Sequence, residues 1–194
     1  MRLYYLLVFV LGGILGTAGD FSHVASQTDG YANPLYPLPT GQPFWVPLLF
    51  GSASLGICIS HLLGDRFLKR PENLLAESWP SAVSGVLVFL GLYVTSGFLP
   101  LPTGGAKDLV LWIISLVFWL LADRTWQGAL LAVGTAVVGT CVEIGLTQSG
   151  AFFYTQNESG FFGVPPWLPS LYIAASVAVG NLARTLERTF SVPK

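Results

Sequence analysis

Six long apolar stretches constrain this chain more than any other feature of its 194-residue sequence. A helix needs about 20 mainly apolar residues to cross a bilayer. The stretches are continuously apolar and do not alternate with polar residues, which disfavours a closed β-barrel. We therefore predict an all-α integral membrane protein that folds as one domain, 1–194, with a bundle of six transmembrane helices. The expected spans are about 3–19, 44–63, 81–99, 107–123, 128–150 and 167–186.

The scarcity of charge supports this prediction. Charged residues make up 10% of the chain, whereas they make up about 25% of a typical soluble domain. Nine basic and ten acidic residues cannot cover the core of a soluble protein of this size. The formal net charge of −1 also leaves no basic excess for phosphate binding. Soluble enzymes, disordered segments and nucleic-acid binders are thereby disfavoured.

The basic residues predict the orientation, because short cytoplasmic segments are enriched in Lys and Arg. If the N-terminus is cytoplasmic, only Lys107 falls in an outer loop. A cleaved signal peptide is the alternative interpretation of the first stretch, which follows Arg2 and ends in small residues at 16–19. We expect both termini to be cytoplasmic, since eight of the nine basic residues then lie inside: Arg2, Arg66, Lys69, Arg70, Arg124, Arg184, Arg188 and Lys194.

Glu143 is an acidic residue within the fifth stretch, seven residues before its end at Gly150. A regular helix would place it about 10 Å below the outer surface. Ionisable groups at such depth are costly and usually face a cavity or a partner. Thr140 and Gln148 lie on neighbouring turns and are candidates for contacts to the same group. These three residues are the predicted lipid-binding site, with a hydrogen bond between helices as the structural alternative.

Familiar catalytic signatures are missing from the sequence. It has no GxxxxGK[ST], HExxH, GxSxG or paired CxxC motif, and we expect no metal and no cofactor. His61, Asn181 and Arg184 lie near the inner ends of their spans, where contacts between helices are favoured over catalysis. Two functions remain open at this point: non-enzymatic lipid binding, and a small transporter or lipid-modifying enzyme that uses Glu143.

The order and spacing of several short motifs resemble the Insig (insulin-induced gene) family of six-span membrane proteins. Each motif is weak alone, but together they cover roughly 44–186. The matching residues are Trp45-Val46-Pro47, Gly51-Ser52-Ala53-Ser54, Asp65-Arg66, Trp79, Val88-Phe89-Leu90-Gly91, Trp119, Asp123-Arg124-Thr125, Gly128, Gly150, Tyr154-Thr155, Trp167-Leu168-Pro169 and Gly180-Asn181-Leu182-Ala183-Arg184.

This resemblance implies a non-enzymatic role in regulating other membrane proteins. Animal Insig proteins are endoplasmic-reticulum anchors that bind Scap and HMG-CoA reductase in a sterol-dependent way, and their helices enclose a lipid-accessible cavity. The family's Asp-Arg-Ser/Thr motif is important for partner binding, and it falls on Asp123 and Arg124 here. The chain departs from animal members because its first span begins at Leu3, without their long hydrophilic N-terminal region.

This departure is typical of a minimal, bacterial homologue. We then expect the plasma membrane, or the endoplasmic-reticulum membrane and the partners Scap and HMG-CoA reductase if the source is eukaryotic. The expected ligand is a diacylglycerol-like glycerolipid or a sterol, because a membrane cavity fills with the lipid available. Gly12 and Gly16 form a GxxxG motif, which allows close helix packing and a homo-oligomer.

Overall fold

The computed structural model describes residues 3–69 and 78–191, and these form an almost wholly helical molecule. Arg2, Arg70 and Lys194, which contribute to the predicted charge asymmetry, lie outside the described residues. Six long helices follow one another along the chain: α1 (Leu3–Ala25), α2 (Val46–Phe67), α3 (Trp79–Phe98), α4 (Ala106–Ala122), α5 (Trp126–Gln148) and α6 (Leu168–Ser191).

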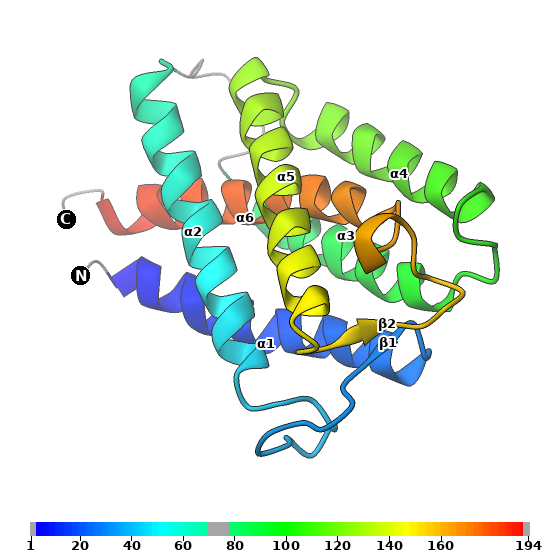
Figure 1. Cartoon of the computed structure of the whole chain (residues 1–194). Helices are drawn as coiled ribbons and strands as arrows, with labels where there is room; N and C mark the ends of the chain where they lie inside the picture. The colour runs from blue at the N-terminus through cyan, green and yellow to red at the C-terminus, as the bar shows by residue number, and fades with distance from the viewer. Residues whose placement is uncertain (1–2, 70–77, 192–194) are drawn as a thin grey trace.

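The last helix, α6, is the centre of the bundle (Figure 1). It contacts every other long helix, and most of its residues from Leu168 to Leu186 are buried. Because protein surrounds α6, its C-terminal half can carry Asn181, Arg184 and Thr185 as buried side chains. This position accounts for its polar sequence.

Four of the helices are long and apolar enough to cross a membrane by length and composition, namely α1, α2, α3 and α5. The fourth helix, α4, has 17 residues. Exposed hydrophobic side chains line its surface, including Leu109, Ile113 and Leu121. This surface is suited to contact with lipid tails, whose apolar character removes the usual penalty for exposing such residues.

The first helix extends six residues beyond the predicted span and ends at Ala25. Asp20 and His23 therefore lie in α1 and not in a loop, which corrects the predicted boundary at residue 19. Both side chains are buried, and Asp20 accepts hydrogen bonds from Gln42 at 2.5 Å and Tyr31 at 2.9 Å. Both donors come from the loop that follows α1. They replace the hydrogen bonds that water would otherwise make to the Asp20 carboxylate.

A small antiparallel sheet joins two loops that are far apart in the sequence. Strand β1 (Asp29–Gly30) pairs with β2 (Phe153–Tyr154), with Asp29 opposite Tyr154. Thr155 extends this contact by donating its backbone N–H to the carbonyl of Thr28 at 3.0 Å. A short 3₁₀ helix, η1 (Phe161–Gly163), follows before α6. The sheet thereby fixes the loop after α1 against the loop after α5.

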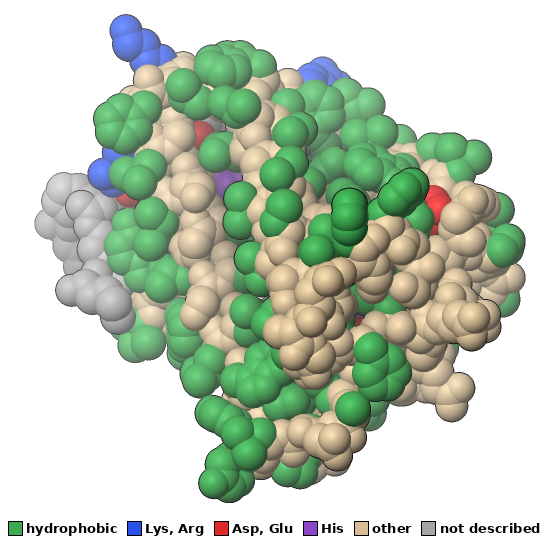
Figure 2. Space-filling view, viewed as in Figure 1, with side chains coloured by type: hydrophobic (Ala, Val, Ile, Leu, Met, Phe, Trp, Pro, Cys, Tyr) green, Lys and Arg blue, Asp and Glu red, His purple; other side chains and the backbone are tan. Residues whose placement is uncertain are grey.

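Both ends of the described chain lie at one side of the bundle, together with the end of α2 and the start of α5 (Figure 1). The two strands lie at the opposite side. On the face shown in Figure 2, the blue Lys and Arg side chains gather toward the side with the termini. The basic side chains visible on this face therefore group at one side of the molecule.

The GxxxG motif of α1 packs against α2 within the chain. A Cβ atom at Gly12 would collide with Ser54, and one at Gly16 would collide with Phe50. The absence of these two side chains lets the helices approach closely. Within one chain, this face of α1 is therefore occupied by α2 and is not free to form an oligomer contact.

Candidate functional site: two cavities that share one polar wall

Two cavities enter the bundle on either side of α2. The larger has a volume of about 570 Å³ and lies between α2 and α5, where small residues such as Ser52, Gly56 and Gly134 line it. The smaller has a volume of about 90 Å³ and is lined mainly by α1, α2, α3 and α6. Seven residues border both cavities: Phe50, Ala53, Ile57, Tyr93, Glu143, Tyr154 and Tyr172.

Glu143 is the acidic residue of this shared wall, as its position within an apolar span suggested. Its Oε2 accepts a hydrogen bond from the Tyr154 hydroxyl at 2.5 Å, and its Oε1 accepts one from the Tyr172 hydroxyl at 2.6 Å. The three residues come from α5, β2 and α6. Two hydroxyl donors offset the cost of placing a carboxyl group among apolar helices.

The structure separates the other two predicted members of the site from Glu143. Gln148 is exposed and donates to the carbonyl of Phe162 at 3.4 Å, because five residues along a helix turn a side chain about 140° away. Thr140 Oγ1 is buried without a hydrogen-bond partner among the described residues. Neither Thr140 nor Gln148 is among the residues that line the two cavities.

Sequence reasoning missed Asp20, Asp29 and Tyr31, which line the larger cavity. They were assigned to an irregular outer loop, and the extension of α1 and the β1–β2 pairing place them at the cavity instead. The available signal was two carboxylates close to an apolar span. Burial raises the pKa of Asp29 to about 8. It is 6% exposed, and water therefore stabilises its charge poorly.

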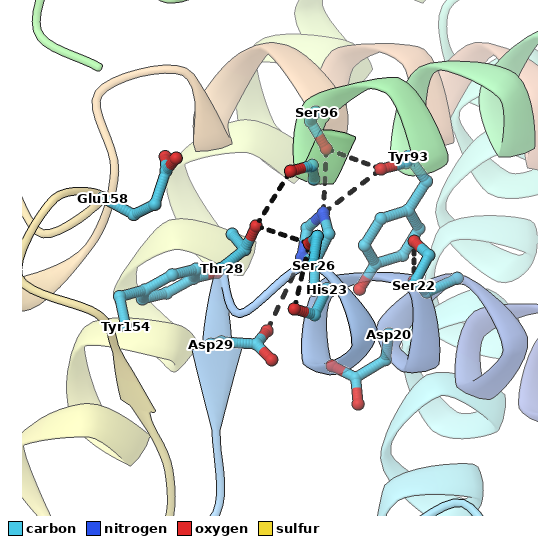
Figure 3. Close-up of polar contacts among 12 residues, drawn as sticks. Asp20, Ser22, His23, Ser26, Thr28, Asp29, Tyr93, Ser96, Tyr154 and Glu158 are labelled. Carbon is cyan, nitrogen blue, oxygen red and sulfur yellow. Dashed lines mark hydrogen bonds and ion pairs between the residues drawn. The ribbon is translucent and has the colours of Figure 1, made fainter. Parts of the chain in front are cut away.

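His23 connects Asp29 to Ser96 on α3 (Figure 3). His23 Nε2 lies 3.2 Å from the backbone carbonyl of Tyr93, which can only accept, so Nε2 carries a hydrogen. His23 Nδ1 lies 3.5 Å from Asp29 Oδ2. His23 Nδ1 and Asp29 Oδ2 therefore share one proton. The pair is either a neutral imidazole with a neutral carboxylic acid, or an imidazolium with a carboxylate.

This Ser–His–Asp arrangement is not built as a nucleophilic site. Ser96 is completely buried, lines neither cavity and donates its hydroxyl to the Tyr93 carbonyl at 2.7 Å. A serine nucleophile has to reach the substrate and give its proton to the histidine. The geometry around Ser96 satisfies neither requirement.

A second polar cluster surrounds Arg184 at the side of the bundle with the termini. Arg184 makes ion pairs with Asp65 on α2 and with Asp123 at the end of α4. It also donates to His61 Nδ1 at 3.0 Å, and His61 Nε2 contacts the Ser176 hydroxyl at 2.8 Å. Because arginine can only donate, the Nδ1 atom accepts and His61 is neutral. The predicted contacts between helices for His61, Asn181 and Arg184 are present.

Asp123 and Arg124, the predicted partner-binding residues, have opposite environments. Asp123 is 3% exposed, and its carboxylate accepts from both the backbone and the hydroxyl of Thr125. Thr125 in turn caps α5 by accepting from the N–H of Gly128 at 3.0 Å. Arg124 is exposed and has a positive φ of 59°. The motif therefore builds a tight turn in which only Arg124 is open to a partner.

The fold and these sites define a helical membrane protein with two cavities inside its bundle. The chain belongs to the insulin-induced protein (INSIG) family, whose sequence model matches residues 3–187. The family resemblance drawn from the motifs is thereby confirmed.

Individual relatives come from bacteria and from animals. An INSIG protein homologue of Mycolicibacterium vanbaalenii is 33% identical over 177 residues, covering 91% of this chain and 83% of the relative. Insulin-induced gene 1 protein of Danio rerio is 26% identical over 181 residues, covering 93% and 71%.

Two solved structures of the mycobacterial Insig homologue MvINS have the same fold. Its crystal structure superposes with a TM-score of 0.84 at 28% identity, covering 98% of this chain and 96% of that one. A cross-linked trimer of a cysteine variant of MvINS gives a TM-score of 0.82 at 29% identity, with the same coverage.

Proposed function

We propose that this protein is a non-enzymatic lipid-binding member of the Insig family. The observation that carries the proposal is the pair of cavities that meet at Glu143, Tyr154 and Tyr172. Pockets that bind small molecules are mainly apolar and contain a few convergent polar groups. The two cavities have this composition, and their apolar walls suit lipid tails.

The shape favours a two-tailed, diacylglycerol-like glycerolipid over a sterol. Ala53 and Ile57 of α2 border both cavities, so two chains can pass on opposite sides of this helix. A single rigid ring system would fill only one side. The hydroxyl groups of Tyr154 and Tyr172 lie where the two sides meet, which suits the head group.

Mass spectrometry of lipids retained by the protein in mild detergent tests this function. We expect one class of two-tailed lipid, or a sterol, to remain bound. Ala53→Phe would narrow both cavities and should release it. Val83→Phe is the matched control, because Val83 is 51% exposed and lines neither cavity. Absence of retained lipid in the unchanged protein, or equal retention in both variants, would overturn the proposal.

All six long helices cross the membrane in this proposal, with both termini in the cytoplasm. The support is the positive-inside distribution of the basic residues and the shared location of the described chain ends in Figure 1. The central position of α6 explains how a polar helix crosses as part of the bundle. The bacterial relative favours the plasma membrane, and a eukaryotic source would favour the endoplasmic reticulum.

Assembly with other membrane proteins is the role that the family implies. The cross-linked MvINS trimer supports a homo-oligomer, which native mass spectrometry would reveal. A second kind of partner would contact the exposed Arg124 beside the buried Asp123. Scap and HMG-CoA reductase are the corresponding candidates in a eukaryotic membrane.

A small transporter or lipid-modifying enzyme that uses Glu143 is the alternative. The observation that favours it is the position of Glu143 on the border of both cavities. Its discriminating test is flux or lipid turnover in proteoliposomes across a range of pH. Activity that disappears in Glu143→Gln would support this alternative, whereas lipid binding without turnover favours the binding function.

A further inference from the structure

Asp29 carries a buried acceptor that the protein leaves without a partner. Its Oδ1 atom has no hydrogen-bond partner among the described residues, although the side chain is 3% exposed. Its Oδ2 atom faces His23 on the other side. Asp29 also lines the larger cavity. An unpaired buried carboxyl oxygen is costly, and it is explained most simply by a donor that arrives with a ligand.

The charges around this oxygen define the kind of donor. Asp20, Asp29 and Glu143 all line the larger cavity, and no Lys or Arg is among its described lining residues. Asp20 and Glu143 each already accept two side-chain hydrogen bonds. A phosphate or carboxylate head group would therefore meet three acidic side chains and no basic side chain. A positively charged donor would meet three acidic side chains.

Aromatic rings complete the wall around the acidic groups. Tyr31 packs edge-on against Trp45 with ring centroids 5.9 Å apart, and it lies 6.1 Å from the ring of Phe152. Phe152 in turn contacts Tyr154 at 5.5 Å. All four residues line the larger cavity. Aromatic faces attract ammonium groups through their quadrupole, most strongly where water is excluded.

We propose that the polar end of the larger cavity is a site for a protonated amine head group, which donates an N–H hydrogen bond to Oδ1 of Asp29. This inference rests on the proposed lipid-binding function and names the chemical class of head group that the site selects. In Figure 3, the Asp20 and Asp29 carboxylates lie on the side of His23 away from Ser96. The two acids therefore face the cavity from neighbouring positions.

The protein environment of Asp29 is compatible with a ligand that brings a positive charge. Burial raises the pKa of Asp29 to about 8, so the protein alone favours the neutral acid near pH 7. A bound ammonium group would favour the carboxylate, because opposite charges stabilise each other strongly at low dielectric. The proton that Asp29 gives up on binding is released to bulk water.

Competition among four synthetic lipids tests the head group. All carry two oleoyl chains on the same glycerol backbone, and they differ only in bearing a hydroxyl, a primary amine, a trimethylammonium or a phosphate at the third carbon. We expect the primary amine to bind about tenfold or more tightly than the hydroxyl lipid, as a charge-assisted hydrogen bond would give. The phosphate lipid should bind most weakly.

The trimethylammonium lipid separates hydrogen bonding from charge, because it has the charge but no N–H donor. Its affinity should fall below that of the primary amine. Equal affinity of the two cationic lipids would overturn the role of the Asp29 hydrogen bond. A hydroxyl or phosphate lipid that binds as tightly as the amine would overturn the amine site while leaving lipid binding intact. Failure of all four lipids to bind would instead contradict the proposed function itself.

Asp29→Asn identifies the residue responsible. This variant keeps the shape and the backbone pairing with Tyr154, and it should reduce the preference for amine over hydroxyl to about threefold or less, through loss of the charged acceptor. Asp108→Asn is the matched control, because Asp108 Oδ1 is also buried without a hydrogen-bond partner in the described part of the chain, and Asp108 lines neither cavity. An equal loss of preference in both variants would overturn the assignment to Asp29.

Discussion

Arg184 on α6 donates two hydrogen bonds to the Asp65 carboxylate on α2, from Nε to Oδ2 at 2.6 Å and from Nη2 to Oδ1 at 3.0 Å. The same guanidinium reaches Asp123 Oδ2 at 3.3 Å. One buried side chain therefore joins α2, α6 and the turn between α4 and α5. Removing part of this arrangement leaves charge behind in a region of low dielectric.

Arg184→Lys should lower the free energy of unfolding by about 3 kcal/mol, because an ammonium group cannot reproduce the two-pronged contact with Asp65. Unfolding midpoints in detergent would measure this. Arg188→Lys is the control at an exposed position of the same helix and should change stability little. Equal midpoints for the two variants would contradict the role of the buried pair.

Asp123→Ala should destabilise the protein by about 3 kcal/mol, since Asp123 pairs with Arg184 and supports the cap of α5. Arg124→Ala should be nearly neutral in stability, because Arg124 is exposed. If partner binding is compared by co-purification, we expect Arg124→Ala to weaken it without a loss of fold. If the Asp123→Ala variant is as stable as the unchanged protein, the result would contradict the structural role of Asp123 in pairing with Arg184 and supporting the cap of α5.

Gly128→Ala should also be destabilising, by about 1–3 kcal/mol, because its added Cβ atom would collide with the Asp123 carboxylate. Gly134 lies on the same helix, and a Cβ atom there would meet nothing within 4 Å. Gly134→Ala should therefore be neutral or stabilise by up to about 1 kcal/mol through helix propensity. Thermal unfolding of the pair of variants checks both signs, and a reversed order would refute the packing argument.

Stability should fall as the pH rises from about 4 to about 8 in lipid-free protein. The pKa of Asp29 is about 8 in the fold and about 3.9 in an unfolded chain. The folded state therefore binds more protons than the unfolded state in this window, and raising the pH favours unfolding. Midpoints measured across this range should show a shallower pH dependence in Asp29→Asn. An unchanged slope would contradict the assignment.

The proposed orientation can be tested with single cysteines in a Cys141→Ser background, since Cys58 is buried. Asn157→Cys lies in the loop before α6 and should react with a membrane-impermeant maleimide on intact cells. Arg124→Cys lies at the opposite side of the bundle and should react only after permeabilisation. The reverse pattern would place the termini outside the cytoplasm.

The sequence by itself determined the class of protein and the family. Long apolar runs and scarce charge act through local composition, because a helix is the structure that satisfies its own backbone in lipid. Each of the six long helices overlaps one of the six predicted stretches, and α1, α2 and α6 extend four to six residues beyond the expected ends. The polar contacts of Glu143 were also predictable, because an isolated acid in an apolar run requires a partner.

Only the tertiary structure decided which residues form the sites. Tyr154 and Tyr172 contact Glu143 from two other elements, and the spacing within one helix cannot reveal such partners. Asp29 reaches the cavity through its pairing with β2, more than 120 residues along the chain. Asp123 is buried because Arg184 crosses to it from α6. Composition determines that the helices insert into a membrane. The packing of distant helices and loops determines which polar groups meet, and this cannot be predicted locally because long-range contacts have no local signature in the sequence.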